Sequence, residues 1–70
     1  MKLDRRNMPD SDFALPKTRQ YPIPDPLHAR LAMSEAKANA TGAERKQIAQ
    51  AIRERYPQMA AEADELAAVT

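Results

Sequence analysis

The stretch 13-FALPKTRQYPIPDPLHARLA-32 decides how this chain folds, because it holds four of the six prolines. Each proline fixes its own φ and removes a backbone donor, and it drives the preceding residue into extended geometry. We therefore expect residues 13–26 to run as a stiff extended arm with polyproline II character, held by side chains rather than by a full ladder. The candidate side chains are Phe13, Leu15, Tyr21 and Ile23, whose two-residue spacing puts each pair on one face.

A first helix is predicted directly after this segment, over residues 26–40. Asp25 is a favoured N-cap residue and Pro26 suits the first helical position. The following LHARLAMSEAKANA is rich in good helix formers. Leu27 and Leu31 lie one turn apart, and we expect this pair to face the core.

A second helix is predicted over residues 43–56, and a third, weaker one over 58–69. Thr41 and Glu44 have the spacing of a capping box, and Pro57 ends the second helix. The second helix carries an apolar stripe of Ile48, Ile52 and Tyr56, and the third a thin stripe of Met59, Ala63, Leu66 and Ala67. Because the first loop is so short, the first two helices should form an αα-hairpin.

The expected fold is thus a small α protein in which the extended proline-rich arm packs on a two-helix hairpin. The expected divisions are a flexible arm at residues 1–12, the arm-plus-hairpin module at 13–57, and an acidic C-terminal helix or tail at 58–70. Phe13, Leu15, Tyr21 and Ile23 would cover the stripe that the two helices leave open.

The composition indicates that this fold is marginal. Only ten of the 70 residues are Leu, Ile, Val or Phe, and the net charge is +1. Small chains usually compensate with disulfides, a metal or a partner. With no cysteine and one histidine, neither a disulfide nor the usual zinc ligand set is available, so no cofactor is expected and a protein partner or self-association remains. A cytosolic product is expected, with neither a membrane span nor a signal peptide.

Several side chains allow two interpretations. Tyr21 and Tyr56, together with Arg19, suit an interface anchor, yet both tyrosines also suit a small core. Arg45, Lys46, Arg53 and Arg55 suggest a phosphate-binding face, but glutamates interleave with them, so a solvated or salt-bridged face is favoured and nucleic acid is disfavoured as a partner.

Catalysis is not expected. His28 has no visible nucleophile or metal-ligand company, and we expect it to hydrogen-bond Asp25 or the extended segment. The carboxylate pairs Asp10 with Asp12 and Asp64 with Glu65 lie in segments without a scaffold to orient them.

The run from Met8 to Pro57 resembles a short module of tailed bacteriophages and prophages. The module pairs a Pro-Asp-Ser lead-in with Phe-Ala-x-Pro, Tyr-Pro-Ile-x-Asp and His-Ala-x-x-Ala, then a second helix ending Arg-x-x-Tyr/Phe-Pro. The matching positions are Pro9, Asp10, Ser11, Phe13, Ala14, Leu15, Pro16, Arg19, Tyr21, Pro22, Ile23, Asp25, His28, Ala29, Ala32, Ile52, Arg53, Arg55, Tyr56 and Pro57. The chain departs from the module in its Ala-rich loop and in the added Pro24 and Pro26.

This resemblance implies a structural role in phage particle assembly, near the head proteins, with no known chemistry. The expected function is a capsid cement or decoration protein of the virion, made in the bacterial cytoplasm. Its expected partner is the major capsid protein or another virion protein, with self-association on the lattice. Its partner-binding residues would be Phe13, Leu15, Arg19, Tyr21, Ile23 and Tyr56. The alternatives are a nucleic-acid-associated regulatory protein and a head-assembly or connector accessory factor.

Overall fold

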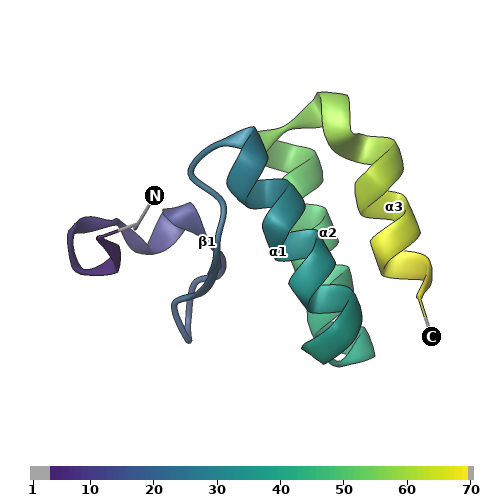
Figure 1. Cartoon of the computed structure of the whole chain (residues 1–70), viewed down its shortest axis with the longest axis horizontal. Coiled ribbons are helices and arrows are strands. Elements are labelled where there is room, and N and C mark those ends of the chain that lie inside the picture. The colour runs from purple at the N-terminus through teal and green to yellow at the C-terminus, as the bar shows by residue number, and fades with distance from the viewer. Residues whose placement is uncertain (1–3, 70) are drawn as a thin grey trace.

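The computed structural model describes residues 4–69, in which three α-helices follow a short β-hairpin (Figure 1). The strands are β1 (Phe13–Leu15) and β2 (Gln20–Pro22), and the helices are α1 (Pro26–Asn39), α2 (Gly42–Arg55) and α3 (Ala60–Ala68). Short 3-10 turns lie at Arg5–Asn7, Asp10–Asp12 and Pro57–Met59. The small α fold with an αα-hairpin is therefore confirmed.

The helices begin where the sequence predicts. The Asp25 carboxylate accepts a hydrogen bond of 2.8 Å from the His28 amide, with Pro26 in the first turn of α1. At α2, the Glu44 amide donates to the Thr41 hydroxyl at 3.1 Å, and the Thr41 amide donates to the Glu44 carboxylate at 2.8 Å. This reciprocal pair satisfies two amides that a helix start leaves without partners.

The proline segment differs from the single extended arm that was predicted. It folds back as an antiparallel hairpin with Phe13 opposite Pro22 and Leu15 opposite Gln20. Two residues have positive φ, Arg19 at 53° at the end of the turn and Tyr21 at 59° within β2. Such angles are uncommon outside glycine, so composition alone did not indicate a turn here. β1 packs on α2 and β2 on α1, which closes one side of the helical hairpin.

The core combines a few large side chains with many alanines. Ile23, Ile48, Ile52 and Leu66 are its largest fully buried members. Leu15 and Ile23 belong to the same core cluster as the buried helical residues, in agreement with the prediction for these two side chains. Phe13 is also buried, but it is not a member of that cluster and lies beneath the Arg19 guanidinium. Tyr21 is half-buried and packs against the same cluster.

The prediction that Leu27 and Leu31 face the core is wrong, because both side chains are exposed, by 65% and 54%. The buried face of α1 is instead formed by Ala29, Ala32, Met33 and Ala36. These residues also follow helical spacing and lie roughly opposite the leucine pair. Because alanine is small, this face lets α1 lie close against α2.

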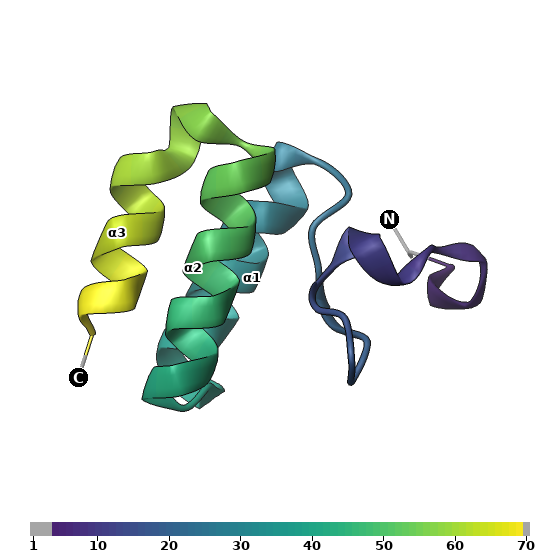
Figure 2. The same ribbon diagram turned by 180° about the vertical axis from the view of Figure 1, so that it is seen from behind.

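The third predicted helix is also present, with Met59, Ala63 and Leu66 buried as expected. α3 packs mainly against α2, and the views from both sides show it beside the helical hairpin (Figure 2). Residues 58–69 are thus part of a three-helix body, whereas Thr70 lies outside the described residues.

Residues 4–12, which we call the projecting arm, extend away from the helices in both views. They form two 3-10 turns, and their side chains are exposed except for the half-buried Met8 and Asp12. Residues 1–3 of the predicted arm lie outside the described part of the chain.

Candidate interaction surfaces

Four of the six predicted partner-binding side chains lie inside the chain's own core. Phe13, Leu15, Ile23 and Tyr56 are each at most 9% exposed. In this fold these four side chains have no free surface to offer a partner. For Tyr56, a place in the core was the alternative interpretation of the sequence. Arg19 and Tyr21 remain partly accessible.

Tyr56 ties the C-terminal end of α2 to the hairpin. Its hydroxyl donates a hydrogen bond of 2.7 Å to the backbone oxygen of Ile23, in a buried setting. A buried carbonyl without a partner is costly, so this contact fixes where the chain leaves β2 and approaches α1.

Arg19 holds the base of the projecting arm. Its guanidinium donates to the Asp10 carboxylate and to the backbone oxygens of Arg5 and Met8, the last at 3.0 Å. It also lies over the Phe13 ring, 4.6 Å from the ring centroid. Arg19 therefore acts within the chain, as the side chain that joins three positions of the arm to the hairpin.

His28 forms the hydrogen bond that the sequence predicted. Its Nδ1 lies 2.8 Å from the Asp25 carboxylate oxygens. Hydrogen bonds from the His28 amide, and then from its ring, hold the pKa of Asp25 below its usual value. Among residues 4–69 no group of three or more His, Cys, Asp and Glu side chains is arranged to hold a metal ion. Asp25 and His28 thus form a helix cap.

The arginines of α2 are engaged with partners in the same chain. Arg53 pairs with Asp64 of α3 at 2.8 Å, and Arg55 pairs with Asp12 at 2.9 Å. The hydrogen bond that Arg55 donates to the Asp12 carboxylate raises the pKa of Arg55 further above its already high value. Arg45 donates to the backbone oxygens of Ala40 and Val69. These contacts compete with phosphate for the cations that the nucleic-acid interpretation requires.

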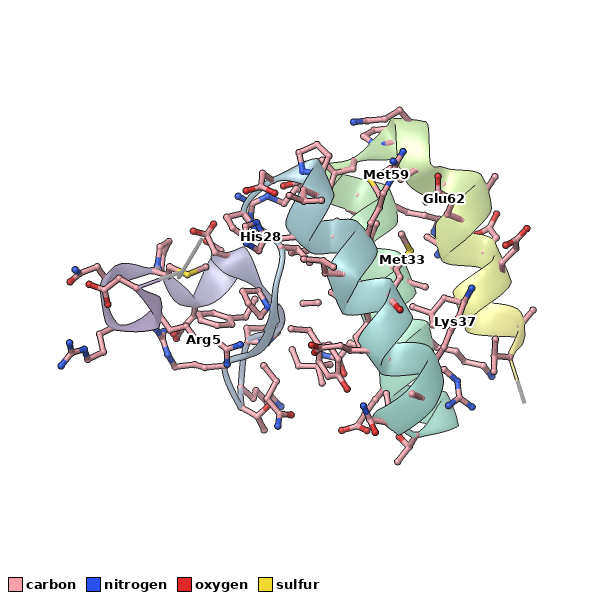
Figure 3. The ribbon with its side chains drawn as sticks, viewed as in Figure 1. Arg5, His28, Met33, Lys37, Met59 and Glu62 are labelled. Carbon is pink, nitrogen blue, oxygen red and sulfur yellow. The ribbon has the colours of Figure 1, made fainter. Side chains whose placement is uncertain are left out.

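Two of the recessed surfaces on the described part of the chain are open to solvent. One lies between the hairpin and α2, beside Phe13, Pro16, Gln47 and Glu54. The other is a groove between α1 and α3, where Arg30 faces Glu62 at 3.7 Å. Figure 3 shows Met33, Lys37 and Glu62 around this groove. The lining of the groove between α1 and α3 also includes Ser34 and Glu65.

The surface that the sequence interpretation missed is the outer face of α1. Leu27 and Leu31 are the exposed large hydrophobic residues of the described chain, and Ser34 and Ala38 continue their line along the helix. α1 lies in front of α2 in Figure 1 and behind it in Figure 2, so the side of α1 turned away from α2 is uncovered. The sequence signal for this surface is that α1 carries two apolar stripes. The alanine stripe is buried in the core, which leaves the leucine stripe on the opposite side exposed.

No family model, curated protein or solved structure matches this chain. Within residues 4–69 no helix has the length and apolar character that crossing a membrane requires.

Proposed function

We propose that this chain is a non-enzymatic structural protein of a tailed-phage particle, of the cement or decoration kind, which docks on the major capsid protein. The proposal is supported by the resemblance of residues 8–57 to a phage module. It is also supported by the shape of the molecule, a closed helical body from which a polar arm projects.

The projecting arm is the observation that carries the docking mode. Phe13, Leu15 and Ile23 are buried and cannot contact a capsid subunit. Residues 4–12 are therefore the segment that would contact it. The arm holds Arg5 and Arg6 against three aspartates, of which Asp10 pairs with Arg19 and Asp12 with Arg55. The exposed end of the arm around Arg5 and Arg6 is therefore weakly basic. An acidic patch on a capsid subunit is the complementary partner surface.

Repetition compensates for the small size of such a contact. Nine mostly exposed residues bury too little area for a tight single interface. When many copies bind a particle that repeats the same site, and neighbouring copies also touch, each binding event raises the effective concentration for the next. Docking on a lattice is therefore the setting in which this arm is effective.

The first test is quantitative mass spectrometry of purified virions, with the major capsid protein as the reference. A copy number comparable to that of the capsid protein supports lattice docking. A handful of copies favours a connector accessory factor, and absence from the particle refutes a virion role and leaves an assembly factor or a nucleic-acid-associated protein.

The docking mode has its own test. Arg5→Glu with Arg6→Glu is expected to reduce the number of copies on the particle, whereas the control Lys46→Glu, at an exposed position of α2, leaves it unchanged. Equal occupancy for both variants would place the docking surface elsewhere on the chain.

A further inference from the structure

The outer face of α1 has the pattern of a two-stranded helical seam. Leu27, Leu31, Ser34 and Ala38 follow one another at spacings of four, three and four residues, and all four are exposed. This is the heptad spacing of positions that meet a second helix. Leu27 and Leu31 contribute the large apolar side chains at one end, and Ser34 and Ala38 allow close approach at the other.

The charges beside this seam identify what covers it. Arg30 lies on one flank, where it is also 3.7 Å from Glu62 of α3 in the same chain, and Glu35 lies on the other. Both side chains are exposed. In a parallel pair of identical helices, a residue on the first flank lies beside the residue five positions later on the partner's second flank. Arg30 of each copy then faces Glu35 of the other, so the pairing forms two opposite-charge contacts by symmetry.

The antiparallel arrangement lacks this match. Identical flanks then meet, which places Arg30 and Lys37 of one copy beside the same residues of the other. Like charges brought together across helices are unfavourable. The charge pattern therefore selects a second copy in parallel orientation.

We propose that the outer face of α1 is a self-association surface, on which a second copy of this chain docks through its own α1 in a parallel, in-register pair. The pair has two-fold symmetry about an axis along the helices, so the hairpin, α3 and the projecting arm of each copy stay on the outer sides. The pairing does not depend on a capsid as the partner, and it leaves the arm free to bind one.

The association is expected to be weak, with a dissociation constant on the order of 1 mM, because only two leucines per copy are large. A concentration series of the purified full chain, followed by sedimentation or NMR diffusion, should show reversible dimers. Leu27→Gln with Leu31→Gln should abolish them. Since both side chains are exposed, the thermal unfolding of the monomer should change little.

Orientation is tested by disulfide trapping, for which a chain without cysteine is well suited. Ala38→Cys places the only thiol at a seam position, and a parallel in-register pair brings the two thiols within bridging distance. Oxidation by glutathione disulfide should give a covalent dimer of this variant and much less of the control Ala61→Cys, at an exposed position of α3. A dimer in solution without efficient Ala38→Cys cross-linking would refute the parallel pair, and a monomer at every concentration would refute self-association.

The charge match has a separate readout. Glu35→Lys should weaken the dimer about tenfold. Adding Arg30→Glu together with Glu62→Lys, which keeps an opposite-charge pair between α1 and α3, should restore the dimer because the two contacts re-form with reversed sign. Failure of this triple variant to recover association would refute the pairing of Arg30 with Glu35.

Discussion

The Tyr56 hydroxyl donates to the backbone oxygen of Ile23 across 33 residues of sequence, at a distance of 2.7 Å. One partner is the cap at the end of α2, and the other lies where β2 leads into α1. Both residues are nearly inaccessible, at 9% and 2% exposure, so water cannot readily replace the contact. This hydrogen bond thus acts together with the buried side chains of Leu15 and Ile23 to hold the hairpin on the helices.

Tyr56→Phe tests this contact while it keeps the ring. The free energy of unfolding should fall by about 1–3 kcal/mol, since a buried carbonyl loses its partner. Urea denaturation measures the change. The matched control is Tyr21→Phe, which removes the same atom from a half-buried ring and should cost about 0.5 kcal/mol or less. Equal effects would mean that the buried hydrogen bond contributes little.

Two leucines test the assignment of faces. Leu66→Ala removes a side chain with no exposed surface and should cost about 2–5 kcal/mol. Leu27→Ala makes the same chemical change at a 65% exposed position and should cost about 0.5 kcal/mol or less. Thermal or urea unfolding at low protein concentration measures both without interference from dimers. A large loss of unfolding free energy for Leu27→Ala would mean that the Leu27 side chain is buried in the core after all.

Arg19→Ala should release the projecting arm but leave the helical body folded. The Arg19 guanidinium donates to Asp10 and to the backbone oxygens of Arg5 and Met8, all of which belong to the arm. None of these three hydrogen bonds involves an α-helix. Trypsin should cleave after Arg5 and Arg6 faster, and amide exchange should rise over residues 4–12 more than in α2.

Arg19→Gly separates the side chain from the backbone. Glycine also releases the arm, but it accepts the φ of 53° without strain. Its melting temperature should therefore exceed that of Arg19→Ala. Lys17→Ala, at an exposed position of the same loop, is the control and should leave cleavage of the arm unchanged.

Asp25 should make the free energy of unfolding depend on pH in the acidic range. Because hydrogen bonds from His28 lower its pKa in the folded chain, the unfolded chain binds the proton more readily. The stabilisation is complete above the usual aspartate pKa of about 3.9 and is lost as the pH falls through the lower folded value. Asp25→Asn keeps a capping oxygen but no charge, so its stability should decline less between about pH 6 and pH 2.

Urea denaturation across that pH range measures the difference between the wild type and Asp25→Asn. Glu35→Gln, which removes an exposed carboxylate from the same helix, controls for the general effect of charge. Parallel curves for the wild type and Asp25→Asn would show that the cap does not depend on ionisation.

Local signals predicted the helices well. Asp25 with Pro26, and Thr41 with Glu44, fixed the helix starts because caps act within four residues. The stripe through Ile48 and Ile52 was also correct, since α2 carries one apolar face. α1 carries two, and spacing alone cannot say which one a second helix covers. The alanine face is buried because its small residues allow α1 to pack against α2.

The hairpin and the candidate surfaces depend on contacts that are distant in sequence. The hairpin has positive φ at Arg19, where the turn ends, and at Tyr21, within β2, and these residue types give no local signal for such angles. Arg55 reaches Asp12, and Tyr56 reaches Ile23, only after the chain has folded back. The partner-binding role predicted for Phe13, Leu15, Ile23 and Tyr56 therefore changed once the core was visible.

The alanine face of α1 has a consequence for heat capacity. Unfolding raises the heat capacity in proportion to the apolar area it exposes, typically by about 12–15 cal/mol/K per residue. Ala29, Ala32 and Ala36 expose little such area when α1 separates from α2, so this chain should lie at or below the low end of that range. Its stability curve is then shallow, and the free energy of unfolding changes slowly between cold and warm conditions.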